Sequence, residues 1–309
     1  MFHDVIVGVD GSPTGRDAIR LAQALADEGA RLTLAHIYGG VPTPGRTASV
    51  KAADAARVES ERLLEAEREV GASSAELVSF CASSVGRGLH MLAEQHAADL
   101  VVVGSHSRGP AGRVLGGDDT RASLNGASCA VAVAPRGYEA RRGGFLRIGG
   151  GYDFSDESHA ALAAARQLAE RDSAKLSALY VVSLPAWGYI APMPANWGEI
   201  IEDDRRAAEE KVTKLEDVDA TAVYGLAGEE LAAFGDRVDL LVVGSRNYGP
   251  VKRLVFGGTS HGLARHARCA LLVLPRTAKP AGRRRHGAHA GAGDPAPDAA
   301  PGDPPQTPS

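Results

Sequence analysis

The sequence has 309 residues, of which 44% are hydrophobic and 5% aromatic, and its formal net charge is −4. A chain of this length suits about two domains of ordinary size. The negative charge disfavours nucleic-acid binding, and no apolar run is long enough for a membrane helix. The N-terminus lacks a basic leader, so a cytoplasmic protein is expected. Cys81, Cys129 and Cys269 are too far apart for a disulfide framework or a structural zinc site, and buried thiols are expected.

Short apolar runs alternate with helical periodicity along the first part of the chain. Residues 4–10 (DVIVGVD) predict a buried strand, and Ser12 is a candidate N-cap with Pro13 at the first helical position. Gly29 is expected to end this helix. The remaining elements are predicted as a strand at 31–38, a longer helix within 49–72, a strand at 76–82, a helix at 88–96, a strand at 99–105, a glycine-rich loop, a short helix and a strand at 130–135.

The chain then repeats this pattern once. Residues 98–117 (ADLVVVGSHSRGPAGRVLGG) return at 238–258 as VDLLVVGSRNYGPVKRLVFGG, and CAVAVAPR at 129–136 returns as CALLVLPR at 269–276. The first strand also returns, with Asp10 over Asp153 and Ser12 over Ser155. The spacing of about 140 residues is a whole domain, which indicates a duplication.

Apolar strands that alternate with helices predict a parallel sheet covered on both faces. The fold class is therefore α/β, with two doubly wound domains of five parallel strands each. The predicted boundaries are 1–140 for the first domain and 141–278 for the second. Residues 279–309 are rich in Pro, Gly and Ala and are expected to be a disordered tail.

The sequence does not support any of three motifs that are typical of enzymes. Residues 258–262 match the G-x-S-x-G nucleophile elbow, with Ser260 as the nucleophile. That triad needs an acid after the serine, but no Asp or Glu occurs between Ser260 and the predicted tail. The chain has no GxxxxGK[ST] phosphate loop, and the glycine cluster at Gly149 is a weak dinucleotide-binding motif.

The paired glycine-rich loops are the remaining candidate site. In each repeat a buried strand ends in Gly-Ser, at Gly104-Ser105 and Gly244-Ser245, and a later glycine pair opens a short helix. Glycine lets backbone approach a ligand, and a helix start offers unpaired N–H groups to an anion. The alternative is that these glycines only form tight turns, and the spacing leaves both interpretations open.

These residues together resemble the universal stress proteins, as a tandem two-domain member. The resemblance covers residues 1–277 and rests on VGVDGS, YDFS, AHI, the two VVGS strands, the loops, and the two strands that follow Cys129 and Cys269. It implies a five-stranded parallel, Rossmann-like fold of the adenine nucleotide alpha hydrolase-like type. It also implies either ATP binding, with Mg²⁺ as an optional companion, through a loop written G-2x-G-9x-G-(S/T), or no binding where that loop is lost.

The resemblance implies nucleotide-binding positions in both halves. Asp10 with Ile37, and Asp153 with Val181, would hold the nucleoside, although an aspartate at this point can also cap the next helix. The loop positions are Gly104, Ser107, Gly117 and Asp118 in the first half, and Gly244, Asn247, Gly257 and Gly258 in the second.

Departures from the loop pattern affect the two halves unequally. Asp118 would place a carboxylate where phosphate approaches, and like charges about 4 Å apart cost roughly 1 kcal/mol even in water. Gly258 only loses a hydroxyl that Thr259 or Ser260 can replace. Ser107 and Asn247 add a side chain where glycine is expected. The second half is therefore the better candidate site, and the first is expected to be degraded.

Three functions follow from these observations. The first is a non-enzymatic protein that binds adenine nucleotide, mainly in its second half, in stress response or regulation. The second is a scaffold that has lost binding and acts through domain pairing and protein partners, and the third is a slow ATPase or adenylyl-transfer enzyme. The resemblance implies that the last strands of the halves pair with each other, and leaves a homodimer open. Residues 183–200 hold both tryptophans and are either a lid or partner-binding loop or, as we favour, an apolar loop packed on the other half.

Overall fold

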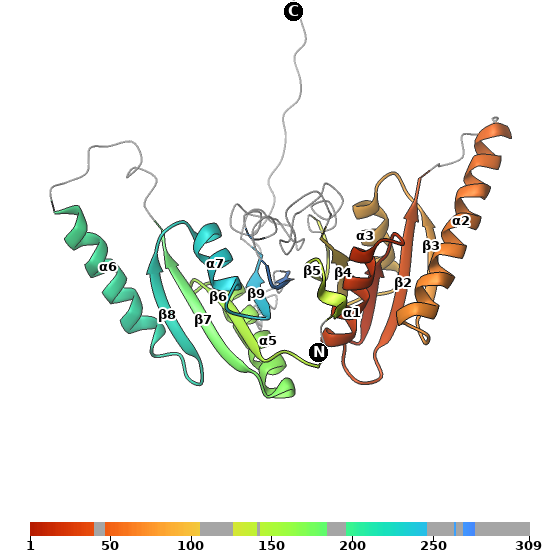
Figure 1. Cartoon of the computed structure of the whole chain (residues 1–309). Helices are drawn as coiled ribbons and strands as arrows, with labels where there is room; N and C mark the ends of the chain where they lie inside the picture. Colours follow the sequence, from red (N-terminus) through yellow and green to blue (C-terminus); the bar gives the residue numbers. More distant parts are fainter. Residues whose placement is uncertain are drawn as a thin grey trace, which may run out of the picture. The chain divides into compact units, whose positions relative to one another are not determined.

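Strands and helices alternate over most of the computed structural model, which describes residues 1–39, 47–105, 126–140, 143–183, 196–245, 263 and 268–275 (Figure 1). The first half contains β1 (Asp4–Gly8), α1 (Pro13–Leu25), β2 (Arg31–Tyr38), α2 (Thr47–Gly71), β3 (Glu76–Cys81), α3 (Val85–Gln95), β4 (Leu100–Gly104) and β5 (Ala130–Ala134). The short helix η1 (Tyr138–Ala140) follows. The second half contains β6 (Arg147–Tyr152), α5 (Asp156–Asp172), β7 (Lys175–Val182), α6 (Trp197–Val212), β8 (Asp219–Tyr224), α7 (Ala227–Gly235), β9 (Leu240–Gly244) and β10 (Ala270–Leu274).

The strands form one ten-stranded sheet in the order β3-β2-β1-β4-β5-β10-β9-β6-β7-β8. All neighbours within a half run parallel, and the two halves join where β5 and β10 pair antiparallel, with Ala132 opposite Leu272. The predicted fold class, two doubly wound repeats, is confirmed. The pairing of the last strands that the resemblance implies is also present.

Serine caps begin the first helix of each half. Ser12 accepts a hydrogen bond from the Gly15 amide at 3.4 Å, and Ser155 accepts one from the Ser158 amide at 3.1 Å. The predicted cap at Ser12 is therefore confirmed. The predicted end of α1 at Gly29 is wrong: the helix ends at Leu25, because Ala26 turns extended and the Asp27 amide bonds to the Phe2 carbonyl. Gly29 instead supplies a φ of +78° in the turn before β2.

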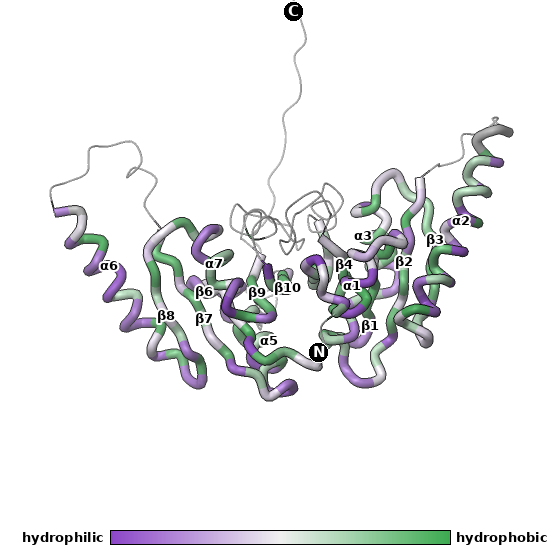
Figure 2. Tube along the Cα trace, viewed as in Figure 1, coloured by the Kyte–Doolittle hydropathy of each residue, from purple (hydrophilic) through white to green (hydrophobic). Residues whose placement is uncertain are grey.

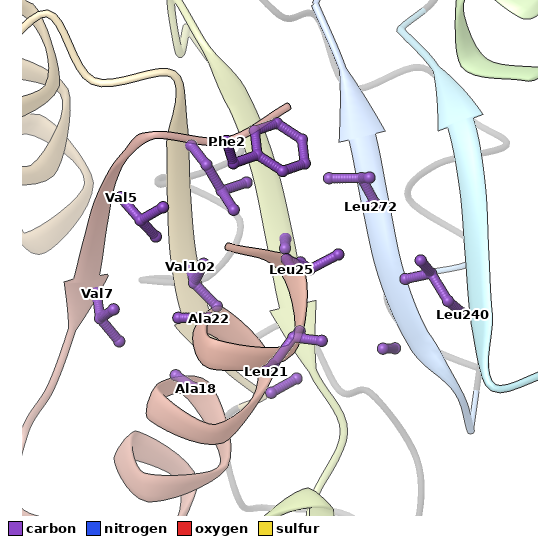
Figure 3. Close-up of a cluster of buried hydrophobic side chains, with 14 of the residues drawn as sticks. Phe2, Val5, Val7, Ala18, Leu21, Ala22, Leu25, Val102, Leu240 and Leu272 are labelled. Atoms are coloured by element: carbon purple, nitrogen blue, oxygen red, sulfur yellow. The ribbon is translucent and has the colours of Figure 1, made fainter. Parts of the chain in front are cut away.

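Alternating side chains of the strands build a core on each face of the sheet. On β1, Val5 and Val7 belong to the cluster under α1, whereas Ile6 belongs to the cluster that includes residues of α3. Figure 2 shows hydrophobic residues along the strands and hydrophilic residues on α2 and α6. The α1 cluster continues across the β5–β10 junction: Leu25 of the first half lies in it with Leu240 and Leu272 of the second (Figure 3).

Hydrogen bonds also tie the two halves together. The Arg171 guanidinium, at the end of α5, donates to the carbonyls of Ala24 at 2.6 Å and Leu25 at 3.2 Å, at the end of α1. Asp17, buried within α1, accepts from the amides of Gly137 at 2.9 Å and Glu139 at 2.7 Å, which fixes the segment that leads to the second half. Residues Met1–Thr277 consequently form one compact unit. Within the residues described, no helix is long and apolar enough to cross a membrane. The predicted boundaries at 140/141 and 278/279 stay predictions.

Candidate functional site

The two halves place an aspartate in the same local geometry after their first strands. In each half the Oδ1 atom of Asp10 or Asp153 accepts from the amide of the capping serine at 3.1 Å and from its hydroxyl at 2.5 Å. These bonds stabilise the turn into α1 or α5 with no ligand needed. Both residues are exposed, and no hydrogen bond within the described part of the chain uses their Oδ2 atoms. Each carboxylate can therefore serve the turn and still accept a bond from a ligand hydroxyl.

Ile37 and Val181 lie near the ends of β2 and β7, half-buried, on the face that α3 and α7 cover. In the first half α3 approaches this position closely, because a Cβ on Gly88 would lie 2.6 Å from Cγ2 of Ile37. The residues that the resemblance pairs with Asp10 and Asp153 thus lie on the strands next to β1 and β6, at the same carboxyl edge of the sheet. Ligands of open α/β sheets bind at this edge, where the strand order reverses.

Gly104 and Gly244 have a packing reason to be glycine. A Cβ on Gly104 would lie 2.1 Å from the Thr14 carbonyl oxygen, and a Cβ on Gly244 would lie 2.7 Å from the Glu157 carbonyl oxygen. The first turns of α1 and α5 therefore pass directly over the ends of β4 and β9. Of the two interpretations open for these glycines, close backbone packing holds in both halves whether or not a ligand binds.

Ser105 and Ser245 follow these glycines and are both buried. Their amides donate to the carbonyls of Ala134 and Leu274, each at 3.0 Å. The Ser245 hydroxyl is buried and has no hydrogen-bond partner among the described residues. It is one of two buried side-chain polar atoms without a partner in the described ranges. A buried polar group left without a partner costs about 1–3 kcal/mol. Ser245 lies at the start of the second predicted loop.

The rest of the predicted loop lies outside the described residues. This applies to Ser107, Gly117 and Asp118 of the first half, and to Asn247, Gly257, Gly258, Thr259 and Ser260 of the second. The short helices predicted after both loops and most of the segment 183–200 fall there too. Their roles stay predictions.

Sequence reasoning missed a buried polar chain in the first half. Nδ1 of His36, on β2, lies 2.8 Å from the hydroxyl of Ser60 on α2, and the Ser79 hydroxyl on β3 donates to Ser60 at 2.6 Å. Burial lowers the pKa of His36, while the charge of Asp10 opposes that shift. The AHI motif includes this histidine, but Ser60 is 24 residues away and Ser79 a further 19, so the sequence did not connect them.

Sequence reasoning also missed an aromatic cluster in the second half. The Phe154 ring forms T-shaped contacts with Tyr152, with centroids 4.9 Å apart, and with Tyr180, with centroids 5.2 Å apart. The Tyr152 hydroxyl lies 3.1 Å from Nδ1 of His159. The signal was present in the sequence, where YDFS replaces the VDGS of the first half.

The remaining candidate groups in the described ranges are the cysteine thiols, potential metal ligands and the glycines of β6. Burial raises the pKa of the Cys129 and Cys269 thiols to about 12, so both stay protonated at neutral pH, as buried hydrophobic residues do. No group of three or more His, Cys, Asp or Glu side chains suited to a metal ion occurs among the residues described. The glycine cluster of β6 is used for packing, since a Cβ on Gly149 would lie 2.6 Å from the Phe234 ring.

Comparison with known proteins identifies the family. The family model described as the universal stress protein family matches residues 1–135 and 144–275. A universal stress protein of Methanocaldococcus jannaschii is 24% identical over 137 residues, which cover 41% of this chain and 80% of that protein. A solved universal stress protein of Archaeoglobus fulgidus has a TM-score of 0.63 at 15% identity, over 90% of this chain and 100% of its own.

A functionally unknown protein of Pseudomonas aeruginosa has a TM-score of 0.59 at 16% identity, over 88% of this chain and 92% of its own. At these identities the solved structures bear on the fold alone. The family model, by contrast, matches most of the sequence, once in each half. The chain belongs to the universal stress protein family.

Proposed function

We propose that the second half of this protein binds an adenine nucleotide and that the protein acts in stress response or regulation without catalysing a reaction. The observation that carries the proposal is the buried, unpartnered hydroxyl of Ser245 at the carboxyl end of β9. Nucleotide phosphates are strong acceptors, and a serine hydroxyl without a partner can donate to one. The equivalent Ser105 is not among the unpartnered buried atoms, which favours the second half.

The second half offers separate groups for the ribose and for the phosphates of a nucleotide. Oδ2 of Asp153 can accept from a ribose hydroxyl, since Oδ1 already holds the turn. The start of α5 is a poor phosphate site, because Asp156 and Glu157 place negative charge in its first turn. Phosphates are therefore expected at the loop after β9, where Lys252 and Arg253 occur in the sequence.

The test of this proposal is calorimetric titration of the full chain with ATP, with Ser245→Ala and Ser105→Ala as a matched pair. Ser245→Ala should weaken binding about tenfold and leave the free energy of unfolding unchanged or raised, because it removes an unsatisfied buried hydroxyl. Ser105→Ala should leave the affinity unchanged.

A second substitution tests which loop is used. Gly258→Asp copies Asp118 of the first half into the second and should abolish binding by repelling phosphate. Equal affinity of Gly258→Asp and the unchanged chain would move the site out of the second loop. If the unchanged chain binds no ATP at millimolar concentration, the proposal is wrong.

The second candidate is a scaffold without nucleotide. The observation in its favour is that Gly104 and Gly244 are both explained by helix packing, and that strand pairing joins the halves through β5 and β10. Absence of ATP binding would support it. A slow ATPase is the third candidate, and time-dependent release of phosphate from bound ATP would separate it from the other two.

A further inference from the structure

Phe154 has a backbone conformation that its side chain disfavours. Its φ is +63°, in the left-handed region, where a bulky residue is under strain. The first half has Gly11 at the same place in its turn, with a φ of +76° and no strain. The turn itself therefore needs no side chain. Residues held in this region cluster at functional sites, where surrounding contacts compensate the strain.

The contacts of Phe154 fix its ring but leave part of it open. Tyr152 and Tyr180 meet the ring at interplanar angles of 66° and 71°, which are edge-to-face arrangements. Tyr152 is buried and its hydroxyl lies beside His159, so this support is itself held in place. Phe154 nonetheless remains 39% exposed. The result is an oriented, partly exposed aromatic surface.

This surface lies beside the proposed nucleotide site. Phe154 directly follows Asp153, whose Oδ2 faces no described partner, at the carboxyl edge of the sheet. The side chains of Tyr152 and Tyr180 lie on the face that α5 and α6 cover, opposite the side chain of Val181. The first half has no equivalent surface, because Gly11 replaces Phe154 and His36 occupies the register position of Tyr180. The aromatic surface therefore lies in the second half, the same half in which the Ser245 hydroxyl has no described hydrogen-bond partner.

We propose that Phe154 stacks on the base of the nucleotide bound in the second half; this inference rests on the proposed function and adds the residue that selects a flat aromatic base. Stacking would favour purines, because their larger rings cover more of the phenyl face. A ligand with the same sugar phosphate and no base would gain nothing from it. The alternative is that Phe154 only covers Tyr180 and supports the fold.

A series at one position separates these two roles. Phe154→Leu keeps an apolar side chain of similar size and the strained backbone but removes the flat ring, whereas Phe154→Tyr keeps the ring. Calorimetry on the full chain should show ATP binding about tenfold weaker for Phe154→Leu and within about twofold for Phe154→Tyr, because stacking a base on an aromatic ring contributes at least that much. Ribose 5-phosphate should bind all three proteins equally.

A fluorescent base gives an independent readout. The triphosphate of 2-aminopurine riboside should be quenched on binding to the unchanged chain and to Phe154→Tyr, and not on binding to Phe154→Leu at saturation. Equal ATP affinity and equal quenching for the Leu and Tyr variants would overturn the stacking role and leave the proposed function standing. Absence of ATP binding by the unchanged chain would overturn both. Thermal unfolding of each variant confirms that it is folded.

Discussion

At the scale of single residues, small differences between the halves give similar positions different chemistry. His36 on β2 and Tyr180 on β7 occupy the same register, yet His36 joins the hydroxyls of Ser60 and Ser79 while Tyr180 meets the Phe154 ring. Burial lowers the pKa of His36 and so favours the neutral imidazole, either tautomer of which can pair Nδ1 with the Ser60 hydroxyl. The first half is therefore sensitive to protonation at this position.

This difference predicts how stability depends on pH. Burial lowers the pKa of His36 in the folded chain below its ordinary value of 6.5, so the unfolded chain binds the proton more readily. His36 contributes stability above about pH 6.5, and that stability is lost as the pH falls through the folded-state pKa, by about 1.4 kcal/mol for each unit between the two pKa values. His36→Gln should flatten the fall in unfolding free energy between pH 7 and pH 5, measured by urea denaturation. An unchanged slope would show that other groups cause it.

At the scale of elements, the ends of the central strands are shaped by the helices that cross them. Gly104 of β4 lies under the first turn of α1, and Gly244 of β9 lies under the first turn of α5. Serine caps place those first turns, so caps and glycines act together in both halves. This arrangement positions Ser105 and Ser245 at the carboxyl edge of the sheet.

Because α1 crosses the end of β4 so closely, a single methyl group added at Gly104 should destabilise the folded protein. Gly104→Ala should destabilise the protein by roughly 1–3 kcal/mol or more, because the new Cβ meets backbone that cannot rotate away. Gly39→Ala is the control, since a Cβ there would meet none of the described atoms within 4 Å. Chemical denaturation of both variants gives the comparison. Equal stabilities would mean that α1 shifts from β4 without cost.

At the scale of the whole molecule, the duplicated halves behave as one folded unit. One hydrophobic cluster extends over the β5–β10 junction, and Arg171 adds hydrogen bonds from one half to the other, while Asp17 holds the segment that leads to the second half. Arg171 binds carbonyls at the C-terminal end of α1, where a cation also interacts favourably with the helix dipole. The junction thus combines apolar burial with directional bonds.

The junction predicts a measurable role for Arg171. Arg171→Gln should lower the free energy of unfolding by on the order of 1 kcal/mol, because charged donors to three α1 carbonyls are lost. Arg206→Gln removes an exposed ion pair on α6 and should change stability by less than about 0.5 kcal/mol. Guanidinium denaturation of the two variants tests this. An Arg171→Gln chain as stable as Arg206→Gln would show that the strands alone hold the junction.

The sequence by itself determined the fold class, the duplication, the cap at Ser12 and the shared position of Asp10 and Asp153. These follow from local periodicity, from capping chemistry and from self-similarity, all of which depend on neighbours in the chain. Local rules failed at the end of α1, where a tertiary bond from Asp27 to Phe2 stops the helix before Gly29. Only the tertiary structure decided that packing explains Gly104 and Gly244, that the Ser245 hydroxyl is unsatisfied, and that Phe154 meets Tyr180. Each of these depends on backbone or side chains brought together from distant positions, and no sequence pattern records such distances.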